Sequence, residues 1–112
     1  MKKIETIIRN DRLNFVKNGL AEKGLTALTV YEVKGRGHQS GIVQVFEGKK
    51  IYADLLPKTK IEIIINDSDV ESVVSTILEN ARTGSIGDGK IFISSIDEAI
   101  RIRTGEKGSE AV

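Results

Sequence analysis

The feature that most limits the fold of this chain is a strand followed closely by a helix, which occurs twice. In the second instance residues 59–65 alternate in hydrophobicity, and apolar side chains then recur at helical spacing over residues 70–81. Residues 68–71, Ser-Asp-Val-Glu, fit a capping box at the start of this helix. In the first instance residues 3–9 predict a strand and residues 10–23 predict a helix.

Three further strands complete the pattern. Residues 25–34 and 90–94 are rich in strand-forming side chains, and residues 100–103, Ile-Arg-Ile-Arg, alternate. The order is therefore β-α-β, a long loop, β-α-β and a short C-terminal strand. This order predicts an α+β fold, a ferredoxin-like sandwich in which both helices cover one face of an antiparallel sheet.

The sheet face opposite the helices is expected to be uncovered in a monomer. Strand alternation places Ile7, Ile64 and Phe92 on that face, opposite the main apolar rows. A chain of 112 residues buries proportionally little of its surface. An exposed apolar face often marks a contact between proteins, so we expect an oligomer.

The whole chain, residues 1–112, is predicted to be one domain with two irregular parts. Residues 36–56 carry scattered glycines and charges and link two strands by a loop far longer than the usual ~4–6 residues. Connections of this length are typical of functional loops. The tail, residues 105–112, is polar and is expected to be flexible.

Composition excludes several classes of function. The chain has no cysteine, which removes disulfides and thiolate catalysis. Its net charge of +1 gives no bulk attraction to nucleic acid or to an anionic membrane. No apolar run approaches the ~20 residues of a membrane-spanning helix, and the N-terminus has no signal-peptide pattern. We expect a cytoplasmic protein that is not embedded in a membrane.

A glycine-rich segment, residues 84–90, matches the first seven positions of a phosphate-binding P-loop. Position eight is Ile91 rather than serine or threonine, and a strand is predicted to follow, so the P-loop mechanism is not expected. Glycine-rich backbone can still present N–H groups to an anion, with Lys90 as a cation. The alternative is a plain tight turn at Asp88 and Gly89.

Two arginines and one histidine are the other candidates for chemistry. Alternation over residues 100–103 would project Arg101 and Arg103 from one face, which suits a polyphosphate or a solvated strand edge. His38 is the only histidine, and no neighbouring nucleophile or second ligand indicates a catalytic or metal site. No residue pattern indicates an enzyme.

Four segments together resemble the PII nitrogen-regulatory signal-transduction proteins. Residues 34–39, Lys-Gly-Arg-Gly-His-Gln, open the long loop, and residues 54–58, Asp-Leu-Leu-Pro-Lys, close it. Residues 83–92, Thr-Gly-Ser-Ile-Gly-Asp-Gly-Lys-Ile-Phe, precede a strand, and residues 101–105, Arg-Ile-Arg-Thr-Gly, end the fold. The four segments occur in the order and at the spacing of that family, and the similarity extends over nearly the whole chain.

The resemblance implies a homotrimer that is not an enzyme and that senses ATP, ADP and 2-oxoglutarate in clefts between subunits. It implies control of an ammonium transporter or nitrogen-assimilation enzymes through a mobile effector loop, residues 36–56. It also implies a Mg²⁺ ion, ligated by Gln39, that joins ATP to 2-oxoglutarate. The nucleotide-binding residues implied are Ile7, Thr29, Gly37, His38, Glu62, Ile64, Gly87, Asp88, Gly89, Lys90, Arg101 and Arg103. Those implied for 2-oxoglutarate are Gly37, Gln39, Gly41 and Lys58.

The chain departs from the family pattern within the loop. His38 stands where arginine is usual, and Ser40 stands where lysine is usual. The tyrosine that many members carry for uridylylation is replaced by Ile51, which leaves Tyr52, one step away, as the nearest candidate for modification. Glu47 stands where an arginine of the family enters the ammonium channel. We therefore expect the loop to signal by ligand-driven ordering rather than by uridylylation.

Three other functions are compatible with the predicted topology or assembly. An acylphosphatase-type enzyme shares the fold and uses arginine to hold phosphate. An RNA-recognition module also shares it but stacks bases on exposed strand aromatics, and the candidate strands offer only Phe92. The main alternative is a PII-like trimeric sensor of another small molecule, because Ser40 and His38 lie near the second ligand.

Overall fold

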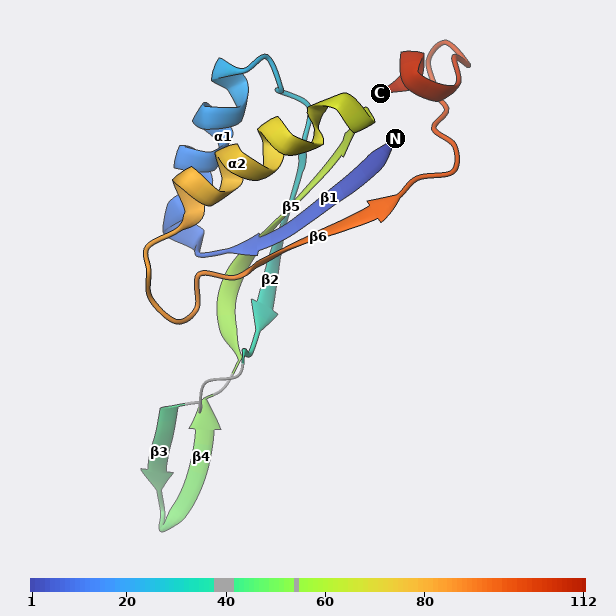
Figure 1. The fold of residues 1–112 in the computed structure, drawn as a ribbon. Helices are drawn as coiled ribbons and strands as arrows, with labels where there is room; N and C mark the ends of the chain where they lie inside the picture. The colour runs from blue at the N-terminus through green and yellow to red at the C-terminus, as the bar shows by residue number, and fades with distance from the viewer. Residues whose placement is uncertain (38–41, 54) are drawn as a thin grey trace.

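The computed structural model describes residues 1–37, 42–53 and 55–112, and its main unit is a four-stranded antiparallel sheet with two helices on one face (Figure 1). The helices are α1 (Leu13–Glu22) and α2 (Val70–Ala81). The strands, in spatial order, are β2 (Thr29–Gly35), β5 (Leu56–Ile65), β1 (Lys2–Ile8) and β6 (Lys90–Ser95). This is the ferredoxin-like α+β arrangement that the sequence predicted.

The hydrophobic core lies between the sheet and the helices, because alternate residues of the central strands face α1 and α2. Thr6 is the one polar residue in the buried row of β1, and its hydroxyl donates a hydrogen bond of 2.9 Å to the Lys90 carbonyl. The inward-facing positions of β1 and β5 are buried, whereas Ile93 of β6 is 50% exposed. The core consists of Ile4, Ile8, Val16, Leu20, Ile61, Ile63, Ile65, Val73, Ile77 and Ala81.

The start of α2 differs from the sequence prediction. The capping box expected over residues 68–71 is not formed, because a 3-10 turn (Asp67–Asp69) precedes the helix and no side chain caps it. The turn closes with a backbone hydrogen bond of 3.0 Å from the Asp69 N–H to the Asn66 carbonyl. A backbone turn therefore replaces the predicted side-chain cap.

The predicted long loop contains a second, two-stranded sheet. Strands β3 (Ile42–Phe46) and β4 (Lys49–Ala53) pair antiparallel and project from the end of the main sheet where β2 stops (Figure 1). Glu47 and Gly48 form the turn, with φ values of 51° and 76°. Two positive φ values in a two-residue turn are typical of the type I′ hairpin. Glu47 is exposed at the tip of the hairpin.

The C-terminal segment corrects another prediction. Residues 101–104 form a turn instead of a strand, and Ile100 makes only an isolated bridge with Lys107. Gly105 has φ 74° and turns the chain back, so that this segment pairs with itself and not with the sheet. The tail, which we expected to be flexible, contains a 3-10 helix (Gly108–Ala111) whose first N–H donates to the Ala99 carbonyl at 2.9 Å.

The open sheet face is mixed rather than apolar. Phe92 is 51% exposed there, but Glu5 lies between two lysines on the same face. The Glu5 carboxylate is 3.8 Å from Lys3 Nζ and 3.7 Å from Lys60 Nζ. The apolar side chains that the sequence placed on this face thus have charged neighbours. None of the helices in the described residues is long and apolar enough to cross a membrane.

Candidate functional site

A pocket of about 680 Å³ lies at the end of the sheet where β1 stops and β6 begins. Ile7 and Lys90 oppose each other in the β1–β6 ladder and form part of its wall. The rest of the lining comes from the loop of residues 85–89, from Lys58 of β5, from Phe92 of β6 and from residues 35–37 at the end of β2. Four segments that are distant in sequence therefore meet at one site.

Glycine conformation brings the loop of residues 83–89 against β1. Gly89 has φ 96°, and a Cβ atom placed there would lie only 1.6 Å from the Ile7 carbonyl oxygen. Gly87 has φ 101°, and its Cβ would meet the Arg9 guanidinium at 3.2 Å. A side chain at position 89 is incompatible with this approach, so the shape of the pocket wall depends on that glycine.

Asp88 holds the loop together from inside. Its carboxylate accepts hydrogen bonds of 2.8 Å from the N–H groups of both Thr83 and Gly84, and one from the Thr83 hydroxyl. Arg9 Nε adds a charged bond of 3.0 Å. These donors, the Thr83 hydroxyl first, hold the pKa of Asp88 far below the ordinary aspartate value. The carboxylate is thus ionised, and both of its oxygens accept hydrogen bonds within the loop and from Arg9.

The backbone of the loop remains available to an anion. Among the turn and loop hydrogen bonds of the described residues, none is donated by the N–H groups of residues 87–89. Consecutive N–H groups in a turn with positive φ values form an anion-binding concavity. The geometry therefore provides a glycine cradle, but no P-loop, because strand β6 follows where a P-loop has a helix.

Two cations brace the outer side of the loop. Arg9 Nη2 donates to the Ile86 carbonyl at 2.6 Å, and Lys58 Nζ donates to the Gly87 carbonyl at 2.9 Å. Lys58 was predicted as a 2-oxoglutarate residue. Arg9 was missed by the sequence analysis, although a basic residue at the end of a strand that also carries Ile7 was a usable signal. Its role is to position the loop.

Replacing Arg9 with methionine is expected to weaken binding of an anion at this loop about tenfold, because both Asp88 and the Ile86 carbonyl lose a charged donor. The matched control is Arg12→Met. Arg12 also donates to a carbonyl, that of Asn80 at 2.7 Å, and lies 4.1 Å from the Phe15 ring, but it does not touch the loop. Calorimetric titration with ADP should separate the two variants; equal affinities would contradict the positioning role.

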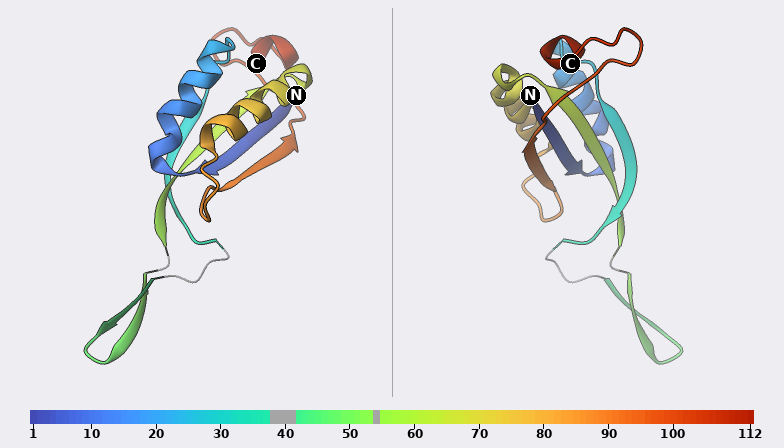
Figure 2. Two further views of the ribbon diagram at one scale, coloured as in Figure 1. Left: turned by 60° about the vertical axis from the view of Figure 1, so that its left-hand side comes forward. Right: turned by 90° about the vertical axis from the view of Figure 1, so that its right-hand side faces the viewer.

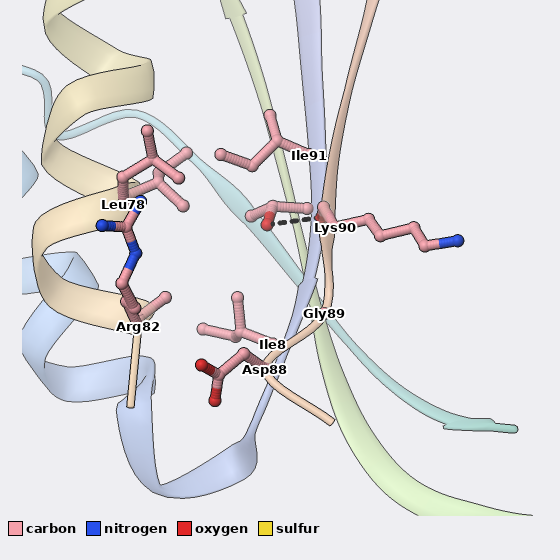
Figure 3. Close-up of a pocket in the computed structure, with 10 residues that line it drawn as sticks. Ile8, Leu78, Arg82, Asp88, Gly89, Lys90 and Ile91 are labelled. Carbon is pink, nitrogen blue, oxygen red and sulfur yellow. Dashed lines mark hydrogen bonds between the residues drawn. The ribbon is translucent and has the colours of Figure 1, made fainter. Parts of the chain in front are cut away.

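Lys90 projects away from the helix layer. Figure 3 shows its side chain on the far side of β6 from Leu78 and Ile91, which border a separate pocket of about 240 Å³ next to α2. Within the described part of the chain, no hydrogen bond or ion pair engages the Lys90 ammonium group. This cation is exposed beside the loop N–H groups, where an anion would gain most from it.

The structure brings together seven of the residues predicted from sequence and places five other described ones away from them. The pocket contains Ile7, Gly37, Lys58, Gly87, Asp88, Gly89 and Lys90. His38, Gln39 and Gly41 lie outside the described residues.

The separated residues lie further along the sheet. Thr29 pairs with Glu62, two positions beyond Lys60, which opposes Ile7. Ile64 is two positions further still. Strand β6 leads away from the pocket to the turn that carries Arg101 and Arg103, at the end of the sheet opposite the hairpin (Figure 2). One copy of the chain therefore does not assemble the predicted site.

Comparison with known proteins gives a consistent result. The profile of the family described as nitrogen regulatory protein P-II matches residues 1–106. Nitrogen regulatory protein P-II 2 of Methanothermobacter thermautotrophicus is 57% identical over 112 residues, which cover all of this chain and 97% of that protein. Nitrogen regulatory protein P-II of Bradyrhizobium diazoefficiens is 53% identical over 112 residues, with both chains covered completely.

Proposed function

Because the chain belongs to the nitrogen regulatory protein P-II family, we propose that it senses ATP, ADP and 2-oxoglutarate and reports them to target proteins through the β3–β4 hairpin. Family membership makes it a nitrogen-regulatory signalling protein. The observation that carries the nucleotide proposal is the pocket in which the exposed Lys90 stands beside a glycine loop with available N–H groups. Polyphosphate binding needs that combination of cation and backbone donors.

A homotrimer supplies what one copy lacks. Arg101 and Arg103 lie at the opposite end of the sheet from the loop of residues 83–89, so in the proposed site a neighbouring subunit contributes them. Exposed apolar side chains near these arginines support an interface: Ile102 is 100% exposed and Ile100 is 57% exposed. Burial of such side chains favours association. Thr29, Glu62 and Ile64 would reach the adenine of the same shared cleft.

The second ligand is proposed to bind next to the first. 2-Oxoglutarate would chelate a Mg²⁺ ion held by the ATP phosphates and Gln39, and its far carboxylate would pair with Lys58. The position of Lys58 in the wall of the pocket supports this placement, because its ammonium group is already within 2.9 Å of the Gly87 carbonyl. Mg²⁺ usually binds through one or two protein ligands together with substrate phosphates, and the proposed site follows that pattern.

The output is proposed to be ordering of the hairpin by these ligands. Tyr52 is the remaining candidate for covalent modification. In β4 its backbone pairs with Val43, whereas the usual acceptor position, Ile51, pairs with Gln44. Because a one-residue shift in an extended strand moves a position to the opposite side, we do not expect Tyr52 to replace the usual acceptor. The targets would be an ammonium transporter or enzymes of nitrogen assimilation in the cytoplasm.

Calorimetric titration of ATP and ADP, with and without Mg²⁺ and 2-oxoglutarate, tests this function. We expect one competing nucleotide site per subunit, and 2-oxoglutarate binding only when both Mg²⁺ and ATP are present. Lys90→Met should weaken both nucleotides about tenfold or more, because a charge-assisted contact contributes roughly 1.5–3 kcal/mol. Lys17→Met, at an exposed position of α1 outside the pocket, is the control.

Four results would contradict parts of the proposal. Undiminished nucleotide binding by Lys90→Met would show that the phosphates bind elsewhere. Binding of 2-oxoglutarate in EDTA would exclude the bridging metal. Nucleotide binding with no 2-oxoglutarate effect would favour the alternative, a trimeric sensor of another small molecule. Light scattering of the same sample should give the mass of a trimer, and a stable monomer would remove the shared cleft.

A further inference from the structure

We propose that the carboxylate of Glu106 is a built-in competitor of nucleotide phosphate for the Arg101 guanidinium. The inference rests on the proposed function, in which Arg101 is a phosphate ligand. It adds that the C-terminal segment itself sets how strongly the site binds nucleotide.

The Arg101 side chain is occupied in the structure. Its Nη1 donates to Glu106 Oε1 at 3.2 Å, and its Nη2 donates to the Glu110 carbonyl at 2.9 Å. The backbone fixes this geometry, because the Arg101 N–H donates to the Glu106 carbonyl at 2.9 Å and the Gly105 N–H donates to the Arg101 carbonyl at 2.7 Å. The turn therefore holds an anion against the arginine.

A second carboxylate, that of Glu98, links the two segments on either side of this turn. Glu98 Oε1 accepts from the Gly108 N–H at 3.1 Å and from the Ala99 N–H at 3.3 Å. These bonds hold the segment after Gly105 against the segment before Arg101. The Glu106 carboxylate consequently returns to Arg101 whenever no other anion is present.

The Arg101–Glu106 ion pair can open and be replaced by a pair between Arg101 and phosphate. A carboxylate and a phosphate oxygen both accept hydrogen bonds from a guanidinium, so the Glu106 carboxylate and a phosphate compete for Nη1 of Arg101. In a single copy of the chain the Arg101 and Glu106 side chains are 38% and 40% exposed, so an anion can reach the ion pair and the pair is weak. Arg103 is exposed, with no hydrogen bond or ion pair to the described residues. It can meet phosphate first, and Arg101 follows when Glu106 releases it.

Glu106→Gln tests the proposal, because it removes the negative charge and keeps the size of the side chain. We expect the dissociation constants of ATP and ADP to fall about two- to fivefold at low salt, the range that matches an exposed ion pair. The gain should disappear at high salt, where such a pair is screened. Glu110→Gln is the matched control. Its contact with Arg101 uses the backbone carbonyl, so its affinity should equal that of the wild type.

The same titrations in an Arg101→Ala background separate this inference from the proposed function. We expect Arg101→Ala to weaken nucleotide binding and to cancel the effect of Glu106→Gln. If Arg101→Ala weakens nucleotide binding but Glu106→Gln leaves it unchanged or weakens it, Glu106 does not compete with phosphate. The proposed nucleotide site would then still hold. If Arg101→Ala binds nucleotide as the wild type does, the assignment of Arg101 to phosphate is wrong, and the inference falls with it. Equal thermal midpoints for the variants would show that folding is not the cause.

Discussion

Replacing Gly89 with alanine is expected to abolish nucleotide binding and to lower the free energy of unfolding by about 3 kcal/mol or more. The new Cβ would lie 1.6 Å from the Ile7 carbonyl oxygen and 2.7 Å from its carbon, both in the backbone of a central strand. Neither atom can move without breaking the β1–β6 ladder, so the loop must shift instead. The φ of 96° adds a penalty of about 1 kcal/mol for a residue other than glycine.

Gly84→Ala is the control for that experiment. Gly84 also has a positive φ, 88°, but a Cβ there would meet no atom within 4 Å. Alanine at this position should therefore cost only the conformational penalty, about 1 kcal/mol, and should largely preserve nucleotide affinity. Urea denaturation together with calorimetric titration of both variants compares the two effects. Similar losses in both would contradict the close approach of Gly89 to β1.

Replacing Asp88 with asparagine is expected to weaken nucleotide binding at least tenfold while the sheet and helices stay folded. The asparagine amide can accept fewer of the four hydrogen bonds that Thr83, Gly84 and Arg9 donate to the carboxylate. These bonds hold the loop of residues 83–89 and make no contribution to the packing of the core, so the loop should lose its order before the core does. Hydrogen exchange of residues 83–89 would detect this loss directly. Asp97→Asn, at an exposed position, is the control.

The pH dependence of stability gives a second measure of Asp88. Its pKa is lowered in the folded state, by the Thr83 hydroxyl above all. The stabilisation is therefore complete above the ordinary aspartate pKa of 3.8 and is lost as the pH falls toward the lowered value. The difference in thermal midpoint between the wild type and Asp88→Asn should be constant at neutral pH and should shrink below pH 3.8. A difference that grows on acidification would contradict the ionised, hydrogen-bonded carboxylate.

Local patterns in the sequence were sufficient for the scaffold. The alternation of residues 59–65 and the helical spacing of residues 70–81 predicted a strand and a helix that are both present. They were reliable because burial on one face imposes a period of two on a strand and 3.6 on a helix. The four family-like segments likewise predicted the P-II membership that the comparisons show.

The strand predicted from alternation over residues 100–103 was wrong, because that segment does not pack against the core. The sequence Ile-Arg-Ile-Arg at residues 100–103 has the period of a strand, yet Ile102 is 100% exposed and the segment turns back on itself. Gly105 and the bond from Arg101 to Glu106 decide this geometry. The prediction of a capping box before α2 was also wrong, because a 3-10 turn of the backbone leads into the helix there.

The sequence by itself determined the sheet, its two helices and the residue types of the site, because periodicity and composition are local properties of the chain. Only the tertiary structure decided how the site works. In the structure Arg9 and Lys58 donate hydrogen bonds to the loop of residues 83–89, and the Asp88 carboxylate accepts hydrogen bonds within it. Arg101 lies at the far end of the sheet, paired with Glu106. Each of these relations joins residues through a side-chain bond whose geometry depends on packing, and no spacing along the chain encodes it.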